Sequence, residues 1–161
     1  MFFERNGLYG YLDSQGNVVV APKFPFAAPR FSEGLAKASI CTDRGILWGF
    51  IDQSGKFAIP PTFEDSKPFR EGLAGVKVNG KWGFINTEGE TIVDPRFADE
   101  WTVHWEFSES LAVVKINEKY GYIDRSGTVV IPAEFDFAKS FSEGKAAVEI
   151  GEKWGFIDRS G

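Results

Sequence analysis

The sequence predicts an all-β protein: a tandem array of about five three-stranded antiparallel β-meander repeats, stacked into an open superhelix. Three observations predict this fold. An aromatic–Gly–aromatic string occurs five times, an Asp-x-x-Gly or Asn-x-x-Gly turn follows each copy, and apolar residues alternate with polar ones between the copies. Self-similarity at a period of about 20–50 residues is the signature of repeat architectures, and period-two alternation is typical of half-buried strands.

The aromatic–Gly–aromatic string sets the period. Its central glycines lie 39, 34, 38 and 34 residues apart, so the basic period is 34, with insertions in the first and third copies. We expect one domain over 1–161, with approximate repeats at 1–33, 34–71, 72–109, 110–143 and an incomplete 144–161. The strings are Tyr9-Gly10-Tyr11, Trp48-Gly49-Phe50, Trp82-Gly83-Phe84, Tyr120-Gly121-Tyr122 and Trp154-Gly155-Phe156.

The residue pattern predicts three strands in each unit, always in the same order. The first follows a Phe-Ser-Glu-Gly turn, as in 111–116, and a tight turn such as Asn79-Gly80 joins it to the aromatic strand. In the Asp-x-x-Gly turn, the Asp side chain can accept from the backbone two residues on, and the glycine tolerates positive φ. The third strand, as in 129–131, is expected to end at proline, which cannot donate to a ladder.

The central glycine of each string needs its own explanation, because glycine inside a strand is unfavourable unless something requires the space. We expect a neighbouring ring to lie over the bare backbone and let successive units stack closely. The alternative is a ladder of exposed rings that binds glycans. The residues assigned to the structural repeat core are Tyr9, Trp48, Trp82, Tyr120 and Trp154, with Gly10, Gly49, Gly83, Gly121 and Gly155.

Together these strings resemble the WG-repeat, or KWG-repeat, family of bacterial proteins. The residues that carry the resemblance are 81–85, 153–158, the Asp-x-x-Gly turns, the Val-Ile-Pro strand end and the Phe-Ser-Glu-Gly turns. Copies 1 and 4 depart from it with Tyr-Gly-Tyr, and the third-copy turn has Ser110 for glycine. The resemblance implies a β-rich repeat array without a shared activity, and it supplies no catalytic residues.

A closed five-bladed β-propeller is the competing architecture. A ring normally completes its last blade with strands from both termini. Here the last copy lacks its third strand, and residues 1–4 belong to the first-strand position of the first copy. Because these ends do not complement each other, an open stack is favoured.

Composition limits the partners. The net charge is −5 and no run of Lys or Arg stands out, which argues against nucleic acid. No stretch of 18 apolar residues is present, and the opening residues 1–7 are too short and too polar for a signal peptide, so we expect no membrane insertion. The compartment and the oligomeric state stay open, with the cytoplasm favoured, because a single cysteine excludes an internal disulfide without fixing the location.

Reactive groups are few. His104 is the only histidine and Cys41 the only cysteine, and neither a P-loop nor a nucleophile elbow is present. The repeated carboxylates have local roles in turns and lack the spacing of a calcium loop. We therefore expect no enzymatic activity, no cofactor and no metal.

The two insertions are the expected partner-binding sites, because insertions in repeat proteins map to loops that often lie on the binding face. Arg44 lies in the first, and Glu100, Trp101, His104 and Trp105 lie in the second. The alternative is that both tryptophans fold back as a plug over the array. The expected function is a non-enzymatic protein–protein interaction or scaffolding module. Alternatives are a glycan- or cell-envelope-binding protein and a small inhibitor or immunity protein.

Overall fold

The computed structural model describes residues 1–43, 45–99 and 103–161, and every regular element in them is a β-strand. The strands form five separate antiparallel sheets. In chain order the sheets contain β1 (Phe2–Arg5), β2 (Leu8–Leu12) and β3 (Val18–Phe24); β4 (Ala36–Thr42), β5 (Gly45–Ile51) and β6 (Phe57–Phe63); β7 (Asp65–Ser66), β8 (Leu73–Val78), β9 (Lys81–Asn86) and β10 (Thr91–Ala98); β11 (Leu111–Ile116), β12 (Lys119–Asp124) and β13 (Val129–Phe135); and β14 (Phe137–Ala138), β15 (Ala146–Ile150) and β16 (Lys153–Ile157).

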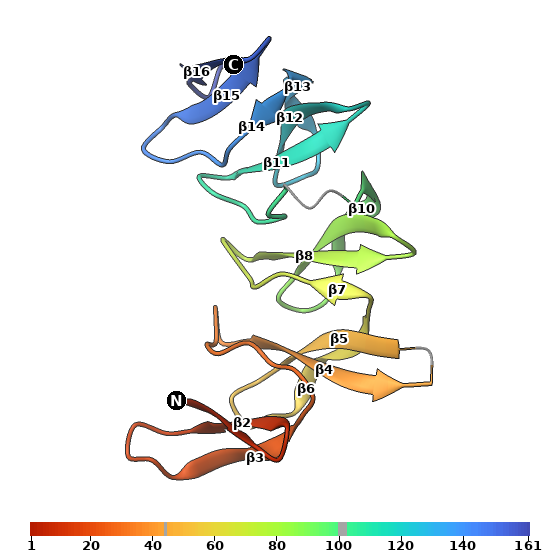
Figure 1. Ribbon diagram of the computed structural model, residues 1–161, viewed down its shortest axis with the longest axis vertical. Helices are drawn as coiled ribbons and strands as arrows, with labels where there is room; N and C mark the ends of the chain where they lie inside the picture. The colour runs from red at the N-terminus through yellow and green to blue at the C-terminus, as the bar shows by residue number, and fades with distance from the viewer. Residues whose placement is uncertain (44, 100–102) are drawn as a thin grey trace.

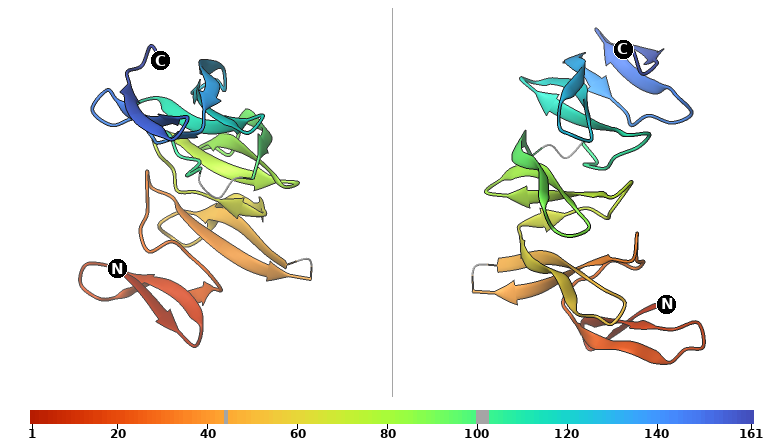
Figure 2. Two further views of the ribbon diagram at one scale, coloured as in Figure 1. Left: turned by 45° about the horizontal axis from the view of Figure 1, so that its top comes forward. Right: turned by 180° about the vertical axis from the view of Figure 1, so that it is seen from behind.

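The five sheets follow one another along the long axis of the molecule, and the two termini lie at opposite ends of the stack (Figure 1). The two further views show the same order (Figure 2). No strand pairing among the described residues joins the first sheet to the last. The predicted open stack is confirmed and the closed propeller is wrong, since nothing pairs the ends into a ring.

In each of the first four units a large β-bulge in the third strand interrupts its pairing with the second strand. Tyr11 pairs with Val20 and Tyr9 pairs with Phe24. The two pairs are thus two residues apart on β2 and four residues apart on β3, which places two extra residues in β3. The same jump occurs in the next three sheets. The expectation that the third strand ends at its proline is therefore wrong. β3 continues through Pro22, because a bulge does not need a ladder hydrogen bond from the proline nitrogen.

This bulge explains the glycine of the aromatic string. A Cβ on Gly10 would lie 2.4 Å from the carbonyl oxygen of Val20 and 2.8 Å from the nitrogen of Pro22. The glycines of the next three units meet the corresponding carbonyl oxygen at 2.4–2.7 Å, namely that of Ile59 for Gly49, Val93 for Gly83 and Ile131 for Gly121. The expected neighbouring ring is thus corrected. The space is filled by the backbone of the same unit's own third strand.

The Asp-x-x-Gly turns have the predicted local geometry. Asp124 Oδ1 accepts from the backbone N–H of Ser126 at 2.9 Å and of Thr128 at 3.0 Å, and the N–H of Gly127 donates to the Asp124 carbonyl at 2.9 Å. The glycine of each turn after the first also packs against the third strand of the preceding unit. These contacts are Gly55 on Val20, Gly89 on Ile59, Gly127 on Val93 and Gly161 on Ile131.

Two short strands modify the three-stranded plan. β7 and β14 precede a Phe-Ser-Glu-Gly-type turn and pair with the first strand of the unit that follows it. The third sheet therefore has four strands. The fifth has three only because β14 is present, and among the described residues no strand occupies the outer edge of β16.

Candidate functional site

Hydrogen bonds between successive Phe-Ser-Glu-Gly turns link neighbouring units along one side of the array. The carboxylate of Glu33 accepts from the backbone N–H of Gly72 at 2.9 Å. Glu71 accepts from the N–H groups of Glu109 and Ser110 at 2.7 and 2.8 Å, and Glu109 accepts from Gly144 at 3.0 Å. The repeated glutamates of these turns thus form hydrogen bonds between units.

The serine hydroxyls of the first and third turns also form hydrogen bonds to the turn that follows in the chain. Ser32 Oγ donates to the carbonyl of Phe69 at 2.7 Å, and Ser108 Oγ donates to that of Phe141 at 2.8 Å. Each turn therefore gives a hydroxyl donor and a carboxylate acceptor to the next turn. Position 70 breaks this rule, because Arg70 stands where Ser32, Ser108 and Ser142 stand in the other turns.

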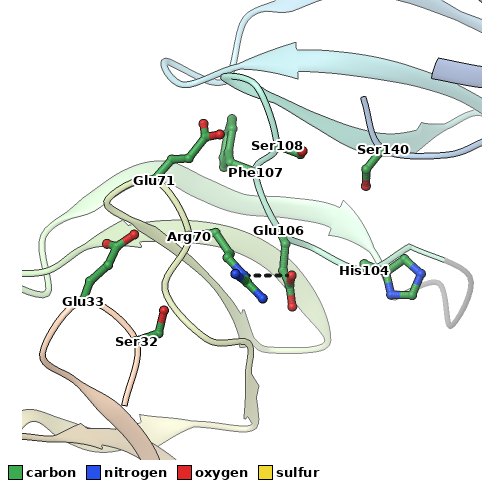
Figure 3. A pocket seen from close by; sticks show the side chains of 9 residues that line it. All are labelled: Ser32, Glu33, Arg70, Glu71, His104, Glu106, Phe107, Ser108 and Ser140. Carbon is green, nitrogen blue, oxygen red and sulfur yellow. Dashed lines mark ion pairs between the residues drawn. The ribbon is translucent and has the colours of Figure 1, made fainter. Parts of the chain in front are cut away.

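A groove of about 520 Å³ runs beside three consecutive turns (Figure 3). Its residues come from those turns, from the insertion before Phe107 and from the segment after β14. They are Ser32, Glu33, Arg70, Glu71, His104, Glu106, Phe107, Ser108 and Ser140. Three of these side chains are carboxylates and one is a guanidinium, so the groove is acidic at neutral pH.

Arg70 and Glu106 form an ion pair in this groove, with Nε and Oε2 3.5 Å apart, as the dashed line in Figure 3 shows. The Arg70 side chain is 61% exposed and that of Glu106 32% exposed. An ion pair this open contributes little to stability, typically about 0–1 kcal/mol. Both side chains are therefore available to a ligand at small cost. Arg70 is not among the partner-binding residues predicted from the sequence, although an arginine at a serine position of the repeat was a signal for it.

Trp105 lies in the core and not on the surface. Its side chain is 2% exposed, and its ring stacks on that of Trp82 with centroids 5.4 Å apart and planes 7° apart. Its main chain lies against β8, where a Cβ on Gly75 would be 2.5 Å from the Trp105 carbonyl oxygen. The other units have Phe2, Lys37, Val113 and Ala147 at the position of Gly75. The prediction of Trp105 as a partner-binding anchor is corrected: it is the plug of the alternative interpretation.

Asp99 ties the start of the same insertion to the array. Its carboxylate accepts from Trp82 Nε1 at 2.6 Å and lies beside the Lys77 ammonium. The hydrogen bond from Lys77, followed by that from Trp82, lowers the pKa of Asp99 below its usual value. This carboxylate therefore serves the packing of the insertion.

The other predicted partner-binding residues divide into two groups. His104 is exposed and lines the groove beside Glu106. Arg44, Glu100 and Trp101 lie outside the described residues, and their assignment stays a prediction. The first insertion lengthens the hairpin before Trp48 as expected, because the β4–β5 ladder runs out to the pair of Thr42 and Gly45.

The aromatic column is mostly covered. Trp82 and Tyr120 are buried, and Tyr9 and Trp48 are partly buried. A lysine ammonium lies over the ring of Trp48 and another over that of Trp82, at 4.1 and 5.2 Å from the ring centres. Trp154 alone of the five is exposed. The described part of the column therefore gives no continuous ladder of open rings for a glycan.

The described residues contain no cluster of metal-ligating side chains. Within 1–43, 45–99 and 103–161 no three His, Cys, Asp or Glu side chains come together in a way that could hold a metal ion. Cys41 lies in β4, whereas His104 precedes Trp105 in the second insertion. No helix in this part of the chain has the length and apolarity needed to cross a membrane.

An open stack of small antiparallel sheets, joined by turn-to-turn hydrogen bonds, defines the chain as a β-repeat protein. The model of the WG containing repeat matches four consecutive segments, at residues 9–40, 48–82, 82–120 and 120–154. The chain therefore belongs to the WG-repeat family. No curated protein and no solved structure matches it.

Proposed function

We propose that the chain is a non-enzymatic protein-interaction module whose acidic groove binds an extended basic segment of a partner. The observation that carries the proposal is the convergence of three non-repeated side chains, Arg70, His104 and Glu106, on one groove. Residues that repeat in every unit serve the array. Residues that break the pattern and stay accessible are the candidates for recognition.

The charge of the groove supports this choice of partner. Glu33, Glu71 and Glu106 place three carboxylates along its length against the single guanidinium of Arg70. A groove lined mainly by one sign of charge attracts the opposite sign and speeds encounter. Glu106 is the residue to test, because Glu33 and Glu71 also accept hydrogen bonds between units, whereas Glu106 pairs with the exposed Arg70.

The test compares Glu106→Lys with Glu134→Lys, which makes the same charge change at an exposed site on β13. The probe is a fluorescein-labelled peptide of alternating lysine and alanine, titrated by anisotropy at low salt and near 0.15 M salt, where screening is substantial. We expect Glu106→Lys to weaken binding at least about tenfold and Glu134→Lys to weaken it far less. Equal losses would show attraction by net charge alone, and the groove would not be the binding site.

Partner capture gives the second readout. Proteins retained from a cell extract by the wild-type chain are compared with those retained by each variant. Partners that are lost with Glu106→Lys and kept with Glu134→Lys support the groove. An enzyme among them that the chain inhibits would identify the inhibitor alternative, which uses the same surface.

A further inference from the structure

A second hollow, of about 400 Å³, adjoins the acidic groove. His104 and Ser140 line both the groove and this hollow, so the two spaces are continuous. Figure 3 shows His104 and Ser140 at one end of the groove and Ser32 and Glu33 at the other. A ligand that lies along the groove from Glu33 therefore reaches the second hollow beyond Ser140.

The charge of the surface changes sign at this point. The second hollow is lined by His104, Phe137, Ala138, Lys139 and Ser140. None of these five residues is a carboxylate, and Lys139 is exposed. The groove itself, by contrast, is lined by three glutamates. We call the second hollow the lysine subsite, because Lys139 gives it a positive charge.

The ammonium of Lys139 lacks the carboxylate partner that its counterpart has. Lys67 and Lys139 directly follow the short strands β7 and β14, so they hold the same place in the third and fifth units. Lys67 Nζ lies 3.8 Å from Oδ2 of Asp65, whereas the position of Asp65 is taken by Phe137 in the fifth unit. Within the described residues Lys139 forms no ion pair, and its ammonium lies over the Trp154 ring, 5.5 Å from the ring centre. The charge is therefore open to an anionic group of a ligand.

We propose that the lysine subsite binds the side-chain carboxylate of an aspartate or glutamate in the same partner segment whose basic residues occupy the groove. This role rests on the proposed function of the groove and specifies the charge pattern of its ligand. The basic residues lie beside the three glutamates, and the acidic residue lies beyond Ser140. Such a pattern selects one register of an extended segment, because a shifted or reversed placement brings like charges together.

The test uses three unlabelled peptides of identical composition with blocked termini. Each combines the alternating lysine and alanine sequence with one glutamate, placed at the amino end, at the carboxyl end or at the centre. Each peptide displaces the fluorescein-labelled lysine–alanine peptide from the whole chain at low salt, where exposed ion pairs are least screened. Because the three peptides have the same net charge, a difference in affinity reports the position of the glutamate.

Three variants assign the effect to Lys139. Lys139→Gln removes the charge of the subsite, and Lys139→Glu reverses it. Lys23→Gln is the matched control, because Lys23 is also exposed and also lies over an aromatic ring, that of Phe24, but lines neither the groove nor the subsite.

We expect one of the two peptides with a terminal glutamate to bind the wild type about two- to fivefold more tightly than the central isomer, the range for an exposed ion pair. The end that gives the gain shows the direction of the bound segment. Lys23→Gln should keep the gain, Lys139→Gln should abolish it, and Lys139→Glu should turn it into a loss.

Equal affinity of the three isomers for the wild type, or a gain that persists in Lys139→Gln, would overturn the subsite. The groove would still be supported in that case if Glu106→Lys weakens binding of the labelled peptide. A gain that Lys23→Gln also abolishes would show attraction by net charge alone and would overturn the subsite as well. If the labelled peptide does not bind the wild type, the proposed function of the groove is wrong and the subsite is wrong with it.

Discussion

At the scale of single residues, Asp124 shows how one carboxylate organises a turn and makes stability depend on pH. The hydrogen bond from Ser126 is the largest of the causes that lower its pKa below the usual value. The pKa values of Asp13, Asp52 and Asp158 are lowered by the same kind of turn contact. A carboxyl with a lowered folded-state pKa stabilises the fold above its unfolded pKa of about 3.9, and this contribution is lost as the pH falls through the folded value.

We expect the Asp124→Asn variant to keep most of the free energy of unfolding at pH 7. Its free energy of unfolding should also fall less between pH 7 and pH 3 than that of the wild type, because an amide oxygen accepts the same hydrogen bonds and does not titrate. The chain contains the precedent, since Asn86 Oδ1 accepts from the N–H of Glu88 and Glu90 at 3.1 and 2.8 Å. The Asp124→Ala variant should have a lower free energy of unfolding than the wild type at both pH values. Urea denaturation at pH 7 and near pH 3 measures this, and an unchanged pH dependence in Asp124→Asn would contradict it.

At the scale of elements, the described end of the second insertion, residues 103–106, packs into the array through the buried side chains of Val103 and Trp105. We expect Trp105→Ala to lower the free energy of unfolding by about 3–5 kcal/mol, the usual range for removing a buried aromatic ring. Gly75→Ala should cost about 1–3 kcal/mol through overpacking, since its Cβ would meet the Trp105 backbone. Ile92→Ala, at a residue 41% exposed, is the control and should change stability little. A wild-type denaturation curve for Trp105→Ala would refute the plug.

The sequence predicts the local parts of each element and not the contacts between elements. The Asp124 turn follows from residue types within four positions of one another, and the antiparallel ladder follows from alternation. The role of Gly10 does not, because the bulge that covers it lies ten or more residues away in the chain. Trp105 looked like an exposed anchor because nothing near it in sequence reveals Trp82 or Gly75 as neighbours. Gly75 was nevertheless a usable signal, as the only glycine at its repeat position.

At the scale of the whole molecule, each unit touches mainly its neighbours, so stability should vary along the stack. The largest core cluster spans the third to fifth units, and β9 and β12 each pair on both sides. We expect native-state hydrogen exchange to be slowest in β9 and β12 and fastest in β16, which has no strand at its outer edge among the described residues. Peptide-resolved exchange followed by mass spectrometry measures this. Uniform protection from β2 to β16 would instead show that the array opens as a single cooperative unit.

The glutamate carboxylates of the first three Phe-Ser-Glu-Gly turns all reach in the same direction along the chain. The carboxylate of one turn accepts from the next, as Glu33 does from Gly72 and Glu109 does from Gly144, while the glycine of each Asp-x-x-Gly turn after the first packs on the third strand of the preceding unit. The three described contacts between successive turns therefore share one type of interaction, a glutamate carboxylate that accepts from backbone N–H groups of the next turn, although the second turn has Arg70 in place of the serine donor. A gene duplication or deletion that adds or removes one whole period keeps each turn carboxylate next to the backbone N–H groups of a following turn. A partial period would leave a turn carboxylate without these donors. Array length is thus a heritable quantity that changes most readily in whole steps, and the loop carrying Trp105 travels with the unit whose Gly75 accommodates it.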